Sequence, residues 1–158
     1  MTDCTYFEDF RVGDRIVSPA RTITETDIVL FASLTGDWHG VHTDREFAKH
    51  TMYGERIAHG LLILAIGGGL MFQTGNLGVP RSTIALYGLE KTRFAIPTKI
   101  GDTIHVEAEV VQVGSIDERR GLITFAHRIL NQRGEEVLTY TSKLVVGRRP
   151  STPGLTAG

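Results

Sequence analysis

The chain has little of what marks several classes of protein. Among its 158 residues are one cysteine and five prolines, and its formal charge is −1. A single thiol, Cys4, cannot build an internal disulfide framework, so we expect a reducing compartment. The near-neutral charge leaves no broad basic face for nucleic acid, and only a local cluster such as Arg119-Arg120 remains. We therefore expect neither a secreted disulfide scaffold nor a nucleic-acid-binding protein.

Long apolar runs are missing as well. The longest covers residues 61–72, which is shorter than the roughly 20 residues that a membrane-spanning helix needs. The first residues are polar and not basic, so no secretory leader is expected. We expect a cytoplasmic protein with no membrane contact, built as a single domain over residues 1–149 with a flexible tail over residues 150–158.

Helical patterns fill the first half of the chain. They predict helices at residues 27–34, 44–50 and 59–73. Thr26 is the expected N-cap of the first helix, Gly36 is its expected left-handed end, and a capping box at residues 43–46 starts the second. The third is apolar on every side, so we expect it to be buried on every side. Its run Gly67-Gly68-Gly69 costs about 1 kcal/mol per glycine relative to alanine, which predicts close approach of another backbone.

Strand patterns fill the second half. Four strands are predicted there, at residues 82–95, 103–113, 122–131 and 137–146, and an opening strand with a turn at residues 12–14 is predicted at residues 10–22. The alternation is clearest in the second of the four, where Ile104 and Val106 face one way and His105 and Glu107 the other. The pattern predicts an antiparallel sheet curled around the apolar helix, and hence an α+β fold.

One loop segment carries the residue types of acid–base chemistry. It reads Thr35-Gly36-Asp37-Trp38-His39-Gly40-Val41-His42-Thr43-Asp44. Its Asp37 and His42 lie five residues apart between two predicted helices, so both could bind one water molecule and move its protons. An alternative set of metal ligands consists of Asp37, His39, His42 and Asp44. Because a His-x-x-His spacing on a turn with no further ligand is thin support, no metal is expected.

The same segment resembles the MaoC-like acyl dehydratases, the group that contains the (R)-specific enoyl-CoA hydratases. The likeness continues through Phe47-Ala48 and Gly54-Glu55-Arg56-Ile57-Ala58-His59-Gly60-Leu61-Leu62, and covers roughly residues 7–147. Two positions depart from the family. His39-Gly40 stands where the family often has Asn-Pro, and Ala65 stands where some members carry a serine near the acyl group.

The resemblance implies a hot-dog fold, in which a five-stranded antiparallel sheet wraps around a long central helix. It implies a homodimer, or a larger assembly of dimers, that binds an acyl-CoA between its subunits. It further implies hydration of a trans-2-enoyl-CoA to a (3R)-3-hydroxyacyl-CoA, or the reverse dehydration. In the family, the residues at the positions of Asp37 and His42 are catalytic, and no cofactor is used beyond the CoA thioester of the substrate.

That reaction needs an activated water, a proton for C2 and a partner for the thioester oxygen. We assign Asp37 as the base and His42 as the partner in proton delivery, with the two roles open to exchange. The backbone N–H of Gly60, in the first turn of the apolar helix, is the expected oxyanion donor. His59 beside it is expected to bond a loop carbonyl. The residues expected to line the acyl pocket are Leu61, Ile63, Leu64 and Ala65.

Two other functions stay open. A hot-dog thioesterase would aim the water at the carbonyl carbon of the thioester, and would release free CoA. A catalytically silent acyl-binding module is the second, and the intact pair of Asp37 and His42 argues against it. No role is expected for His50, His105 or His127.

Overall fold

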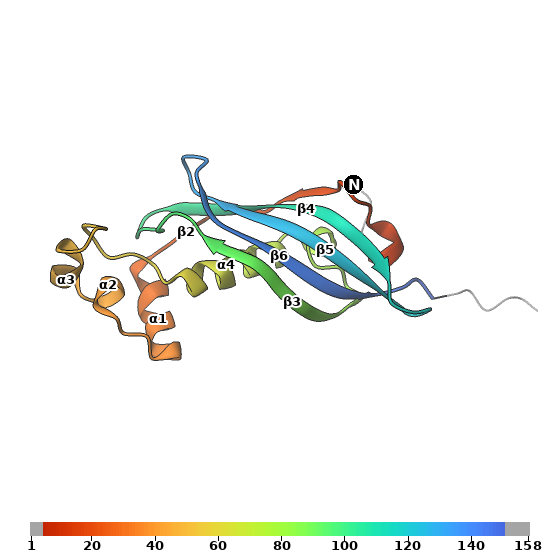
Figure 1. Cartoon of the computed structure of the whole chain (residues 1–158), viewed down its shortest axis with the longest axis horizontal. Helices are drawn as coiled ribbons and strands as arrows, with labels where there is room; N and C mark the ends of the chain where they lie inside the picture. Colours follow the sequence, from red (N-terminus) through yellow and green to blue (C-terminus); the bar gives the residue numbers. More distant parts are fainter. Residues whose placement is uncertain (1–4, 151–158) are drawn as a thin grey trace, which may run out of the picture.

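One antiparallel sheet curves over one long helix, and a group of short helices lies at one end (Figure 1). This computed structural model describes residues 5–150, so Cys4 and residues 151–158 of the predicted tail lie outside the described residues. Two 3-10 turns flank the main elements: η1 (Phe7–Asp9) precedes the first strand, and η2 (Gly75–Leu77) follows the long helix. The fold class is α+β, as predicted.

The sheet has the strand order β1-β4-β5-β6-β3, and every neighbouring pair is antiparallel. Its strands are β1 (Arg15–Val17), β2 (Arg21–Thr22), β3 (Thr83–Phe94), β4 (Thr103–Ser115), β5 (Arg120–Leu130) and β6 (Glu136–Gly147). The short β2 pairs with the start of β4, outside that order. The four long strands lie within two residues of their predicted bounds, which confirms them.

The predicted opening strand at residues 10–22 is wrong in its extent. Two short strands, β1 and β2, stand there, and both pair with β4. Pro19 lies between them, and a proline has no N–H to continue the ladder. The turn expected at residues 12–14 is present: Gly13 has a positive φ of 95°, and its N–H donates to the Val110 carbonyl at 2.8 Å.

Helix α4 (Gly60–Phe72) lies along the concave face of the sheet, and the two together enclose the core (Figure 1). Leu62, Ile66 and Leu70 recur on one face of the helix and are buried. Ile104 and Val106 alternate toward the same core from β4, as predicted. A sheet wrapped around a central helix in this way is the hot-dog fold.

Helix α4 is not buried on every side in this chain, contrary to the prediction. Leu61 and Phe72 are 62% and 70% exposed, and Ala65 and Gly69 are exposed as well. The sheet covers only one side of the helix, so the opposite side is left uncovered. Among the residues that the structure describes, no helix combines the length and the apolar character needed to cross a membrane.

The glycines of α4 do not meet another backbone, which corrects a second prediction about this helix. A Cβ atom at Gly67 would collide with the side chain of Ile129 on β5. A Cβ atom at Gly68 or Gly69 would meet nothing within 4 Å. Close packing therefore requires glycine at only one of the three positions, and the neighbour that requires it is a buried side chain.

Helix α1 (Glu25–Thr35) begins two residues earlier than predicted. Its N-cap is Thr24 and not Thr26. The Thr24 hydroxyl accepts a hydrogen bond from the Asp27 N–H at 3.3 Å, and the Asp27 carboxylate accepts one from the Thr24 N–H at 2.8 Å. This reciprocal pair fixes the start of the helix. Gly36 ends the helix with a left-handed φ of 78°, as predicted.

Helices α2 (Gly40–Thr43) and α3 (Arg45–Lys49) follow, and with α1 they lie beyond the sheet at the end where α4 begins (Figure 1). The predicted capping box of α3 is not formed by Thr43. Asp44 is the N-cap instead, because its carboxylate accepts the N–H groups of Glu46 and Phe47 at 2.9 and 3.0 Å. The short helices thus frame the segment that carries Asp37 and His42.

We expect Gly67→Ala to lower the free energy of unfolding by about 1–3 kcal/mol relative to Gly69→Ala, because the added methyl group overpacks the contact with Ile129. Gly69→Ala raises the helix propensity by the same amount, up to about 1 kcal/mol, and its added methyl group meets no other atom within 4 Å. Urea unfolding of both variants measures the difference. Equal stability of the two would contradict the packing assigned to Gly67.

Candidate active site

Asp37 follows the end of α1 directly, on a tight loop. Its N–H donates to the Thr35 hydroxyl, and its carboxylate accepts the His39 N–H, both at 3.3 Å. The left-handed turn at Gly36 sets the direction of this loop. The Asp37 side chain is 52% exposed, so its carboxylate is held by local hydrogen bonds and still reaches solvent.

His42 lies on the short helix α2, whereas the sequence predicted a loop at this position. Its Nδ1 is 2.8 Å from the carbonyl oxygen of Ile57. A carbonyl oxygen only accepts, so Nδ1 carries the proton and Nε2 of the neutral ring presents a lone pair. Burial lowers the pKa of His42 below its ordinary 6.5, and the neighbouring His59 adds to that shift. The Ile57 hydrogen bond and the charge of Asp37 oppose it.

His59 is the N-cap residue of α4 and is only 3% exposed. Its Nε2 donates to the backbone carbonyl of Asp37 at 3.0 Å and lies 4.0 Å from the Asp37 carboxylate. Its ring stacks on the ring of His42, with centroids 3.8 Å apart. The prediction that His59 bonds a loop carbonyl is confirmed. One buried imidazole therefore contacts both residues assigned to acid–base chemistry.

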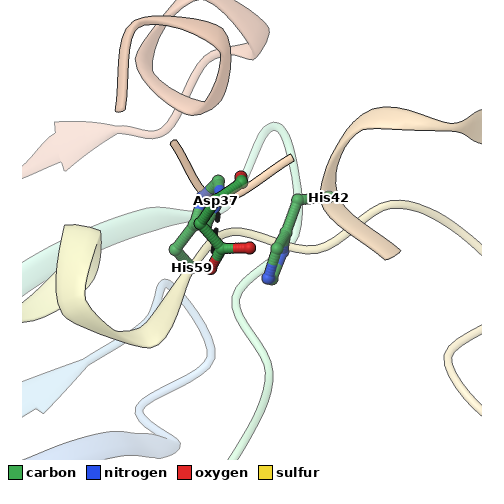
Figure 2. A group of neighbouring side chains, drawn as sticks. All are labelled: Asp37, His42 and His59. Carbon is green, nitrogen blue, oxygen red and sulfur yellow. Dashed lines mark hydrogen bonds and ion pairs between the residues drawn. The ribbon is translucent and has the colours of Figure 1, made fainter. Parts of the chain in front are cut away.

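Figure 2 shows the three side chains gathered in one place, with the Asp37 carboxylate directed toward the His42 ring. Their potential ligand atoms all lie within 4.8 Å of one another, so this group could hold a metal ion. His59 could lend its Nε2 only by giving up the hydrogen bond to the Asp37 carbonyl.

The four-residue metal set suggested by the sequence is not assembled. The His39 Nδ1 accepts the Val41 N–H, and the Asp44 carboxylate caps α3. Both side chains therefore have other partners. The three side chains that lie close together in the structure are Asp37, His42 and His59. The first two belong to the metal set suggested by the sequence, and His59 does not.

A cavity of about 320 Å³ opens beside His42 and is lined by Gly60 and Ile63 from α4. Gly60 is the first residue of α4, where backbone N–H groups lack helical partners. Its N–H makes no hydrogen bond to another described residue. A Cβ atom at Gly60 would lie 2.8 Å from ring atoms of Phe94, so glycine permits this close approach.

The four residues predicted to line an acyl pocket do not share one cavity. Ile63 lines the cavity beside His42, whereas Leu61, Leu64 and Ala65 line a second one of about 420 Å³. We call this second cavity the α4 groove. It lies between α4, β3, β5 and β6, and its walls are formed by Leu61, Leu64, Ala65, Gly68, Met71, Phe72, Gly78, Val79, Thr83, Leu86, Leu89, His127, Tyr140, Ser142 and Leu144.

Sequence reasoning did not find Tyr53, Phe94 or Leu138, which also line the cavity beside His42. These residues come from a loop and from two strands far apart in the chain. Phe94 and Leu138 are brought together by the pairing of β3 with β6. No local pattern in the sequence could signal that register.

We expect His42 to titrate below pH 6.5 in the folded protein, with the proton of its neutral ring on Nδ1. In the unfolded chain the same group keeps a pKa of about 6.5 and binds a proton first as the pH falls. This group therefore makes the folded state less stable as the pH drops below about 6.5. NMR of the ring nitrogens reports both properties. A pKa above 6.5, or a neutral ring protonated at Nε2, would refute this description.

Comparison with known proteins places the chain in a family. A family model described as "MaoC like domain" matches residues 10–128. Protein MaoC of Klebsiella aerogenes is 44% identical over 64% of this chain, a match that spans only 29% of that protein. The (R)-specific enoyl-CoA hydratase of Rhodospirillum rubrum is 36% identical, with 76% of this chain and 77% of that enzyme covered. The crystal structure of a monoamine oxidase regulatory protein from Archaeoglobus fulgidus has a TM-score of 0.84 and 42% identity, covering 92% of this chain and 95% of the other. The chain therefore belongs to the MaoC-like dehydratase family.

Proposed function

We propose that the protein interconverts a trans-2-enoyl-CoA and a (3R)-3-hydroxyacyl-CoA by adding or removing water. The observation that carries this proposal is that the Asp37 carboxylate is directed toward the ring of His42, whose Nε2 makes no hydrogen bond to a described residue, and that His42 lines a cavity. The relatives include hydro-lyases that act on enoyl-CoA thioesters, which supports the same reaction class here. The acyl-CoA is the proposed partner, and the reaction needs no metal or further cofactor.

The proposed mechanism uses two acceptors and one water molecule. An ionised Asp37 and a neutral His42 both accept hydrogen bonds, so together they can hold the two protons of one water and leave an oxygen lone pair free. As that oxygen bonds to C3, one water proton passes to the acceptors and one proton is delivered to C2. The net change is addition of H and OH across the double bond. Asp37 is assigned as the base that removes the water proton. The proton then passes to Nε2 of His42, which delivers it to C2, so that Asp37 returns to its ionised form and His42 to its neutral form.

The start of α4 suits the third task, stabilisation of the thioester oxygen. The Gly60 N–H has no hydrogen-bond partner among the described residues and lies where the helix dipole is positive. The same residue lines the cavity that His42 lines. We assign this N–H as the donor to the oxygen that gains negative charge in the transition state.

We expect Asp37→Asn to reduce hydration of crotonyl-CoA by at least about 10²-fold, because the amide cannot accept a proton from water. The melting temperature should change little, since the Asp37 side chain is half exposed. Asp44→Asn is the matched control: it makes the same chemical change seven residues away, and asparagine caps a helix as well as aspartate does. It should keep full activity. Near-normal turnover by Asp37→Asn, or equal losses in both variants, would refute the assignment.

We further propose that the protein is a homodimer, or an assembly of dimers. Strand β3 is an edge of the sheet, and β6 is its only partner in the part of the chain that the structure describes. One row of its backbone groups is therefore available for pairing with another chain. Its large apolar side chains are exposed at Ile84, Leu86, Tyr87, Leu89 and Phe94. The uncovered side of α4 continues this surface with Leu61 and Phe72. A contiguous apolar surface of this kind is typical of a subunit interface.

Light scattering coupled to gel filtration should therefore report a mass of two chains or an even multiple. Tyr87→Lys should shift the mass toward a single chain, because it places a charge in the apolar surface of β3. Val12→Lys, at an exposed position in the turn before β1, is the control and should leave the mass unchanged. A wild-type protein that is monomeric at assay concentrations would overturn the dimer.

A further inference from the structure

The α4 groove differs in character on its two sides. The wall formed by α4 is apolar, with Leu61, Leu64 and Met71. The wall formed by the sheet carries four polar side chains, which are Thr83, His127, Tyr140 and Ser142. Within residues 5–150, no Asp, Glu, Lys or Arg side chain lines the groove. The groove thus combines an apolar path with neutral hydrogen-bonding groups on one side.

His127 is the centre of the polar wall, although no role was expected for it from the sequence. It is 5% exposed, and its Nε2 lies 2.8 Å from the Ser142 hydroxyl. Its ring stacks on the ring of Tyr140 with centroids 4.3 Å apart and planes 7° from parallel. Burial lowers the pKa of His127 to about 4 and raises the pKa of Tyr140 to about 12, so both side chains are neutral near pH 7.

Several polar atoms of this wall lack a partner among the described residues. Nδ1 of His127 and the hydroxyl of Thr83 are buried and make no hydrogen bond. The Tyr140 hydroxyl makes none to another described residue either. Buried polar groups are almost always paired, and each one left unpaired costs about 1–3 kcal/mol. Two such buried atoms lie in this wall, and Tyr140, whose hydroxyl also has no partner among the described residues, lines the groove, which points to a ligand that supplies hydrogen bonds there.

The register of β6 connects this wall to the candidate active site. Leu138, Tyr140, Ser142 and Leu144 alternate along one face of β6, and all four are buried. Leu138 lines the cavity beside His42, and the other three line the α4 groove. Ser142 lies four residues from Leu138, which is about 13 Å along a strand. An acyl chain that followed this face of β6 from Leu138 would meet Tyr140 after about 7 Å and Ser142 after about 13 Å.

We propose that the α4 groove binds the distal part of the acyl chain, and that Tyr140, Ser142 and His127 select a chain that carries a neutral oxygen group, such as a hydroxyl. The inference rests on the proposed function, since it places an acyl thioester at Asp37 and His42. A terminal carboxylate is disfavoured, because burying a charge without an opposite charge costs several kcal/mol and the groove offers none.

The test measures binding and turnover separately. Calorimetry compares three saturated thioesters of equal chain length that cannot be hydrated and are long enough to reach Ser142: dodecanoyl-CoA, ω-hydroxydodecanoyl-CoA and the ω-carboxylate, dodecanedioyl-CoA. The wild type should bind the hydroxyl form about tenfold more tightly than the methyl form, as one hydrogen bond to a buried group predicts. The carboxylate form should bind most weakly.

Tyr140→Phe and Ser142→Ala should each reduce the preference for the hydroxyl form toward one, while hydration of crotonyl-CoA, whose short chain ends before the polar wall, stays unchanged. Ser33→Ala, at an exposed position of α1 that lines neither cavity, is the matched control for Ser142→Ala and should keep the preference. Equal affinity of the wild type for the methyl and hydroxyl forms would overturn the inference, as would a preference for the carboxylate or one retained in both groove variants. Absence of crotonyl-CoA hydration by the wild type would instead contradict the proposed function.

Discussion

The arrangement of the candidate site depends on the contacts of one buried side chain, the imidazole of His59. It stands at the start of α4, donates to the Asp37 carbonyl and stacks on the ring of His42. The loop after α1, the short helix α2 and the central helix therefore meet at one side chain that is almost fully buried. Because α4 is packed against the sheet along its length, the rigid core of the fold positions a loop that would otherwise be held only by local hydrogen bonds.

This arrangement also sets the electrostatics of the proposed chemistry. The Ile57 carbonyl holds the His42 proton on Nδ1, and burial keeps the ring neutral. Asp37 remains partly in solvent, where a carboxylate is well hydrated. Two acceptors of different kinds thus face one space beside the first turn of α4, whose N–H groups can meet developing negative charge. The loop after α1 and helix α2 provide the groups that would bind the water, and the first turn of α4 provides the group that would polarise the thioester.

Much of this could be predicted from the sequence because its signals are local. The glycine at Gly36 predicted a helix end, and the alternation around Ile104 predicted a strand. The pairing and register of strands that are far apart in the chain could not be predicted in the same way. The position of Phe94 against Gly60, the burial of His127 and the open side of α4 all depend on the register and curvature of the sheet. Cap positions were missed by one or two residues, since both Thr24 and Thr26 are chemically able to cap and only Thr24 has Asp27 at the reciprocal position.

The most direct test of the central claim is to find which carbon the activated water attacks. Purified wild-type protein is incubated with crotonyl-CoA in water labelled with heavy oxygen, and the products are examined by mass spectrometry. The account predicts one labelled oxygen in the hydroxyl group at C3 of 3-hydroxybutyryl-CoA, with no free CoA formed. Label in the carboxylate of released crotonate, together with free CoA, would contradict it and would identify a thioesterase.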